Sequence, residues 1–123
     1  MAEDALRLAF VADTAGREDE ALAHYRRAFE LGVPEDELAA ASLGYGSTLR
    51  NVGSVDESVG VLSAAAERFP EHRALRVFLA YSLWSAGRRA DAMRSLVAAL
   101  YIGEAAPELE RYRRSLTRYA NEL

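Results

Sequence analysis

The sequence predicts an all-α fold, an α-solenoid of three helical hairpins followed by a C-terminal capping helix, with seven helices in all. Apolar residues recur at helical spacing along the whole chain, and no segment alternates apolar and polar residues as a strand does. Three glycines recur 37 and then 34 residues apart, a period typical of helical-hairpin repeats. With 123 residues, half of them apolar, the chain can form one domain with its own core.

The expected helices are bounded by residues that commonly end or begin helices. Gly16, Gly53 and Gly87 each follow a helical run, where a left-handed residue closes a helix. Ser54 and Glu57 have the spacing of a capping box at the start of the helix that follows Gly53. We expect the seven helices near these residues: 2–15, 18–31, 35–51, 55–69, 71–86, 89–102 and 107–121.

The last expected helix carries one apolar stripe on an otherwise charged surface. Pro107 stands in its first turn, a position that proline favours. The stripe residues are Leu109, Tyr112, Leu116 and Tyr119. Because the end of a solenoid otherwise leaves its stacking face in water, we expect this stripe to pack against Leu96 and Leu100.

Alignment on the three glycines places small residues at matching positions, where helices must approach closely. They stand seven residues before each glycine, and five and twelve residues after it: Ala9, Gly46, Ala80, Ala21, Ser58, Ala92, Ala28, Ala65 and Ala99. This pattern resembles the tetratricopeptide repeat, and residues 40–70 resemble it most, with Tyr45, Gly46, Leu49 and Pro70.

The resemblance implies one domain spanning residues 1–123, with repeats near 3–34, 40–70 and 74–104 and a terminal helix near 107–121. It implies a protein–protein interaction module without catalytic activity. The chain also resembles a group of small stand-alone bacterial tetratricopeptide proteins that are suspected to act as dimers. This second resemblance implies a homodimer that forms through an apolar surface.

Composition removes several kinds of chemistry. The chain has no cysteine and no lysine, so thiol catalysis, zinc–thiolate sites, a P-loop lysine and a lysine Schiff base are excluded. A net charge of −4 gives no basic field for nucleic acid, and no apolar stretch is long enough for a membrane span. The acidic N-terminus lacks a secretion signal, so we expect a cytoplasmic protein. The two histidines, His24 and His72, fall in different repeats on polar helix faces, so we expect no cofactor, no metal and no enzymatic activity.

The first helix of each hairpin is expected to line a concave groove that binds a partner. The residues that the resemblance places there are Phe10, Leu43, Ser47, Arg50, Asn51, Val77, Tyr81 and Trp84. The helix at 71–86 is apolar around nearly its whole circumference, so Tyr81 and Trp84 need a cover. Three covers are open: the terminal helix, a second copy of the chain, or a foreign peptide or helix. In the third case the protein would be a monomeric adaptor that binds a linear peptide or helix of another protein.

Two glycines inside expected helices have no place in the repeat pattern. Glycine inside a helix costs about 1 kcal/mol relative to alanine. Gly44 flanks the expected groove, so either a close approach of another backbone or plain tolerance explains it. Gly60 raises the same question on the outer face.

Overall fold

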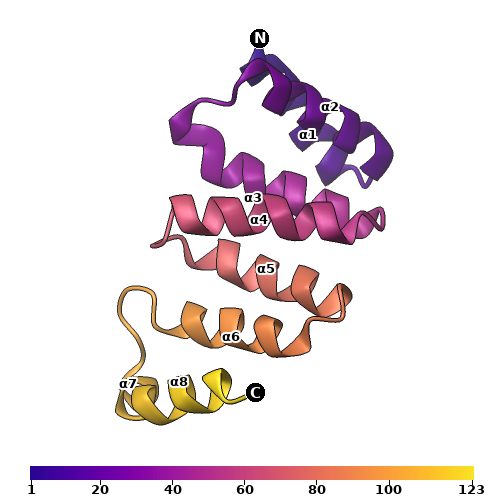
Figure 1. Cartoon of the computed structure of the whole chain (residues 1–123). Coiled ribbons are helices and arrows are strands. Elements are labelled where there is room, and N and C mark those ends of the chain that lie inside the picture. The colour runs from indigo at the N-terminus through magenta and orange to yellow at the C-terminus, as the bar shows by residue number, and fades with distance from the viewer.

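The computed structural model describes residues 1–123 as a stack of helices without any strand (Figure 1). The fold is therefore all-α, as the sequence predicts. No helix is both long enough and apolar enough to span a membrane. The eight helices are α1 (Ala2–Thr14), α2 (Glu18–Leu31), α3 (Glu35–Asn51), α4 (Val55–Arg68), α5 (Arg73–Ser85), α6 (Arg89–Leu100), α7 (Pro107–Arg111) and α8 (Arg113–Asn121).

Consecutive helices pair into hairpins, and the hairpins stack into a solenoid (Figure 1). The first hairpin is α1 with α2, the second is α3 with α4, and the third is α5 with α6. The leading helix of each later hairpin packs on both helices of the hairpin before it: α3 lies on α1 and α2, and α5 lies on α3 and α4. Each of the first two hairpins therefore presents a face that the next leading helix covers.

The glycines that define the repeat end their helices in the expected way. Gly16, Gly53 and Gly87 have φ of 77°, 91° and 79°, in the left-handed region that favours glycine. The alanines twelve residues after each glycine are buried, as close packing of neighbouring helices requires: Ala28, Ala65 and Ala99. These two features confirm the alignment on which the repeat was built.

The capping box expected at Ser54 and Glu57 does not form. Ser54 is the N-cap of α4 but makes no side-chain capping hydrogen bond. Glu57 instead accepts two hydrogen bonds from Arg26 on α2, at 2.7 and 3.1 Å, and one from Tyr45 Oη on α3 at 3.3 Å. Hydrogen bonding by the Arg26 guanidinium holds the pKa of Glu57 below its ordinary value. A tertiary ion pair therefore takes the carboxylate that a local cap would use.

The two junctions between hairpins use different chemistry. At the first, the Tyr25 ring stacks on the Tyr45 ring with centroids 6.0 Å apart, and Tyr25 Oη donates to Asp13 at 2.8 Å. Burial, with Asp13 alongside, raises the pKa of Tyr25 far above its ordinary value. At the second, Ser58 Oγ donates to the Gly46 carbonyl at 2.6 Å and lies 2.7 Å from Ser82 Oγ. Aromatic stacking thus dominates the first junction, and a pair of buried hydroxyls lies at the second.

The two unexplained glycines have different environments. Gly44 is buried, and a Cβ there would lie 2.8 Å from Tyr25 Cζ. The close approach considered for Gly44 is therefore real, but it involves the Tyr25 ring and not a backbone. Gly60 lies exposed on α4, and a Cβ there would meet nothing within 4 Å. Packing therefore gives no reason for Gly60.

The terminal segment differs from the expected single helix. It is interrupted at Tyr112, whose N–H bonds to Leu109 O in a tighter turn that separates α7 from α8. Arg94 donates to Leu123 O at 2.7 Å, and Tyr101 Oη donates to Leu109 O at 2.7 Å, so the segment is held against α6.

The expected packing of the whole apolar stripe is wrong. Leu109 and Leu116 are half-buried, but Tyr112 and Tyr119 are exposed. Leu96 and Leu100, their expected partners, are also exposed. Because the anchors are Arg94 and Tyr101, the segment lies over a neighbouring face of α6. It leaves the groove between α5 and α6 open.

Candidate protein-binding groove

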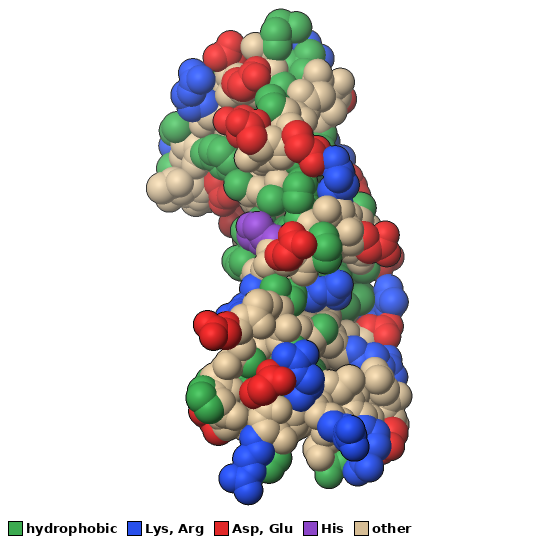
Figure 2. Space-filling model, turned by 90° about the vertical axis from the view of Figure 1, so that its left-hand side faces the viewer, with side chains coloured by type: hydrophobic (Ala, Val, Ile, Leu, Met, Phe, Trp, Pro, Cys, Tyr) green, Lys and Arg blue, Asp and Glu red, His purple; other side chains and the backbone are tan.

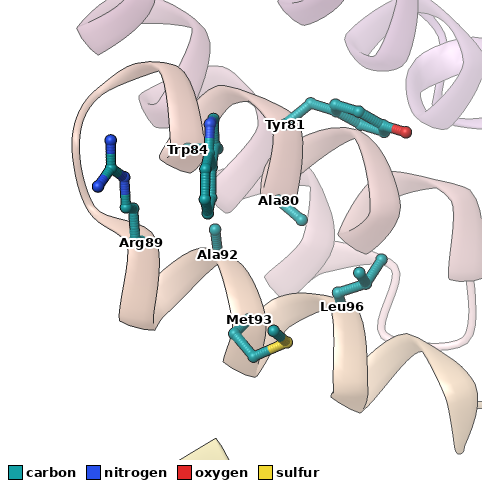
Figure 3. Close-up of a pocket in the computed structure, with 7 residues that line it drawn as sticks. All are labelled: Ala80, Tyr81, Trp84, Arg89, Ala92, Met93 and Leu96. Carbon is teal, nitrogen blue, oxygen red and sulfur yellow. The ribbon is translucent and has the colours of Figure 1, made fainter. Parts of the chain in front are cut away.

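An open apolar groove of about 310 Å³ lies between α5 and α6 at the end of the hairpin stack (Figure 3). Helix α5 contributes one wall and α6 contributes the other. The lining residues are Ala80, Tyr81, Trp84, Arg89, Ala92, Met93 and Leu96. Six of these seven side chains are apolar, so the groove suits an apolar surface of another helix or peptide.

The repeat alignment explains why this groove is open. We call residues equivalent when they stand at the same distance from the glycine of their own hairpin. Leu96 is equivalent to Tyr25 and Leu62, and both of these are fully buried at 0% exposure, whereas Leu96 is 42% exposed. In the first two hairpins the next leading helix covers this position. After the third hairpin there is no further leading helix, and α8 packs on α6 without lining the groove.

Trp84 stands at one end of the groove with most of its side chain in solvent. It is 57% exposed, and the Arg89 guanidinium lies over its ring at 4.9 Å from the centroid. Figure 3 shows the two side chains facing each other at one end, with Met93 and Leu96 further along α6. Arg89 forms no salt bridge. The pair therefore presents an aromatic face and an uncompensated positive charge, both common at binding hot spots.

Tyr81 connects this groove to a smaller hollow on the concave side. The hollow has a volume of about 180 Å³ and is lined by Ser47, Arg50, Phe78, Tyr81 and Ser82. Arg50 is already occupied there: its guanidinium lies 5.5 Å from the Tyr81 ring centroid, and its Nε donates to Ser85 Oγ at 3.1 Å. Tyr81 itself is 59% exposed and belongs to both surfaces.

The structure brings some of the sequence-predicted partner-binding residues together. Ser47, Arg50 and Tyr81 line the concave hollow, and Tyr81 and Trp84 line the end groove. The others lie apart from both hollows. Phe10 packs edge-on against Tyr25, Leu43 packs on the second core cluster, and Asn51 donates to Glu18 at 3.1 Å. Val77 is half-buried on α5.

The sequence analysis missed half of the groove. Arg89, Met93 and Leu96 come from α6, the second helix of its hairpin, whereas only first helices were expected to contribute. The signal was present in the repeat alignment, because Leu96 is equivalent to Tyr25 and Leu62 on the stacking face. Leu96 was instead assigned to contact with the terminal helix. Elsewhere, no three His, Asp or Glu side chains gather in a way that could hold a metal ion.

Comparison with known proteins agrees with the architecture. A family model described as "Tetratrico peptide repeat" matches residues 3–123, which is nearly the whole chain. No curated protein matches the chain. The family is one of protein–protein interaction scaffolds, in keeping with a stack of hairpins that exposes grooves. With the hairpin stack and the family match in agreement, the chain belongs to the tetratricopeptide repeat family.

Proposed function

We propose that this protein is a self-associating interaction scaffold, and that the groove between α5 and α6 is its principal binding surface. The observation that carries the proposal is the exposure of Leu96, in a position that is wholly buried at both other hairpins. An apolar groove in water favours a partner, because covering apolar surface stabilises a complex by about 25 cal/mol per Å².

The terminal helix is one of three covers that the sequence allows for Tyr81 and Trp84. It packs on a different face of α6, and both aromatics stay exposed. A second copy and a foreign peptide are then the two occupants to distinguish. The concave hollow, which a peptide adaptor would use, is smaller, and its one arginine already bonds to Ser85. The smaller volume of the concave hollow and its occupied arginine favour the end groove as the binding surface. Because equivalent faces inside the molecule are covered by helices, we propose a helix as its occupant rather than an extended peptide.

Light scattering across a concentration series tests the proposal. We expect the wild-type chain to self-associate, and Trp84→Ala to weaken the association by about 2 kcal/mol or more, as for a hot-spot aromatic. Tyr119→Ala is the matched control, because Tyr119 is an exposed aromatic on α8 outside the groove. A wild-type chain that stays monomeric at every concentration contradicts self-association. Equal effects of the two variants contradict the choice of groove.

A further inference from the structure

We propose that the occupant of the groove is α1 of a second copy, so that copies associate head to tail and continue the solenoid. This inference rests on the proposed function and names the partner surface for the same groove. The groove takes a leading helix at each junction inside the molecule. The leading helix of the first hairpin, α1, has a side on which no helix of the structure packs.

The free side of α1 carries apolar side chains that its equivalents bury. Leu8 is exposed, whereas the equivalent Tyr45 and Leu79 are buried. Val11 is also exposed, and its equivalents Thr48 and Ser82 are buried. These equivalents face the hairpin that precedes them. Leu8 and Val11 therefore form the missing half of a junction whose other half is the open groove.

The contacts at the first junction indicate which residues would meet between copies. The Tyr45 ring lies 6.0 Å from the Tyr25 ring and 4.8 Å from the Phe29 ring. The equivalents of Tyr25 and Phe29 are Leu96 and Leu100, and the equivalent of Tyr45 is Leu8. Leu8 of one copy would thus cover Leu96 and Leu100 of the other. All three are exposed leucines, so the pairing removes apolar surface from water on both sides.

The sizes of the side chains agree with this pairing. Gly44 on α3 has no side chain because the Tyr25 ring occupies that space. In the proposed contact the position of Tyr25 is taken by Leu96, which is shorter, and that of Gly44 by Arg7. Arg7 has the space that a shorter partner leaves, and its long side chain can place the guanidinium in solvent.

The two parts of the chain that carry the two surfaces have opposite net charge. Residues 1–40 hold ten carboxylates and four arginines, a net charge of −6, whereas residues 41–103 hold five carboxylates and seven arginines, a net charge of +2. On the face drawn in Figure 2, red side chains are more frequent on the N-terminal half and blue ones towards the other end. Opposite net charges favour a head-to-tail arrangement over one that joins like ends.

Arg89 gives this complementarity a specific place. At the first junction Asn51, in the last turn of α3, donates to Glu18, and the equivalents of Asn51 and Glu18 are Thr14 and Arg89. Arg89 would therefore lie beside the last turn of the second copy's α1. That turn contains no basic residue. A guanidinium near a helix C-terminus is stabilised by the negative end of the helix dipole.

The experiment uses two variants of the full chain that each lose one half of the proposed contact. Leu8→Gln combined with Val11→Gln removes the apolar face of α1, and Met93→Gln combined with Leu96→Gln removes the apolar wall of the groove. None of these changes alters a charge, and all four positions are exposed, so the fold should tolerate them. Thermal melts of both variants verify folding, and Tyr119→Gln on α8 is the control for an exposed apolar position outside the contact.

Analytical ultracentrifugation of each variant and of their mixture provides the decisive measurement. A head-to-tail contact uses two different surfaces, so one variant can donate an intact α1 to the intact groove of the other. We expect each variant alone to associate at least about tenfold more weakly than wild type. We expect the mixture to form a one-to-one complex, and the control to associate as wild type does.

The other outcomes separate this inference from the proposed function. If the wild-type chain never self-associates, both are overturned. If it does, and the α1 variant associates as wild type does, only the head-to-tail contact is overturned. A mixture that stays monomeric while both variants fail alone also overturns it, because that result indicates a two-fold contact in which each copy uses both surfaces.

Discussion

Leu62 and Leu96 occupy the same position in successive hairpins, on α4 and α6, yet one is fully buried and the other is 42% exposed. Around Leu62, Gly46 and the leading helix α5 close the groove. Around Leu96 the groove between α5 and α6 is open, because α8 is anchored on another face of α6. The two residues are chemically identical, so the difference between them comes from their neighbours alone.

The comparison shows how a repeat protein obtains an exposed apolar groove without a special motif. A stacking face is built once per hairpin, and each interior hairpin covers the face before it. The last face carries apolar side chains, Leu96 and Leu100, at equivalent positions and has no such cover. The groove at the end of this solenoid is thus an ordinary core position that meets solvent. The affinity for a helix that we propose for it would come from the same packing that makes the interior junctions stable.

Replacing Leu62 and Leu96 by alanine should give the largest difference in stability between the two positions. Leu62→Ala should lower the free energy of unfolding by about 2–5 kcal/mol, because it removes a fully buried side chain and leaves a cavity. Leu96→Ala should lower it by less than about 1 kcal/mol in the monomer, since solvent already reaches that side chain. Urea unfolding at a concentration below self-association measures both. Equal losses would show that the groove is closed in solution.

Replacing Gly44 and Gly60 by alanine should change the free energy of unfolding in opposite directions. Gly44→Ala should destabilise by about 1–3 kcal/mol, because its Cβ overlaps the Tyr25 ring in a packed junction. Gly60→Ala should stabilise by up to about 1 kcal/mol, because its Cβ meets open space and alanine favours the helix. Thermal melts of the two variants check this. If Gly44→Ala instead raised the free energy of unfolding, the first junction would be packed less tightly in solution than in the structure.

Removal of the terminal segment tests how much α7 and α8 contribute. If the apolar stripe of the terminal segment, Leu109, Tyr112, Leu116 and Tyr119, were completely buried, truncation after Ala105 would unfold the chain. The observed packing, in which Tyr112 and Tyr119 are exposed, predicts a loss of about 2 kcal/mol with the three hairpins still folded. Circular dichroism and denaturant melts of the truncated chain measure this. Loss of cooperative unfolding would indicate that α8 also holds α5 and α6 together.

Removing the ion pair between Arg26 and Glu57 should give the smallest change in the free energy of unfolding, and this change should depend on pH. Because Arg26 lowers the pKa of Glu57 in the folded chain, the contribution is fully present above the ordinary pKa of 4.5 and is lost as the pH falls through the lowered folded value. Glu57→Gln should cost at most about 1 kcal/mol at neutral pH, since both partners are well exposed.

The control for this effect is Glu20, which stands in the equivalent position on α2. Glu20 pairs with Arg17 three residues away and not with another hairpin. Glu20→Gln should therefore change stability less than Glu57→Gln does at neutral pH. Chemical denaturation of both variants at neutral and acidic pH makes the comparison. A difference between wild type and Glu57→Gln that stays constant down to acidic pH would contradict the role of the ion pair.

Residue patterns alone located much of this fold. Each of the first six expected helices begins and ends within two residues of an observed helix, because glycine, proline and apolar spacing act within one or two turns. The small residues of the repeat also mark the positions that become buried at the stacking faces. For the candidate groove, the same reasoning identified Tyr81 and Trp84 as apolar side chains without a cover.

Tertiary structure decided the features that depend on distant partners. Glu57 has the spacing of a cap but bonds to Arg26 because α2 and α4 bring the two side chains together. Position 44 has no room for a side chain because the Tyr25 ring, 19 residues away in the chain, occupies that space. The face of α6 that α8 covers is set by Arg94 and Tyr101, so Leu96 stays in solvent. The local sequence pattern determines where a helix begins and ends and which of its faces is apolar. Which side chains contact one another depends on how all the helices pack.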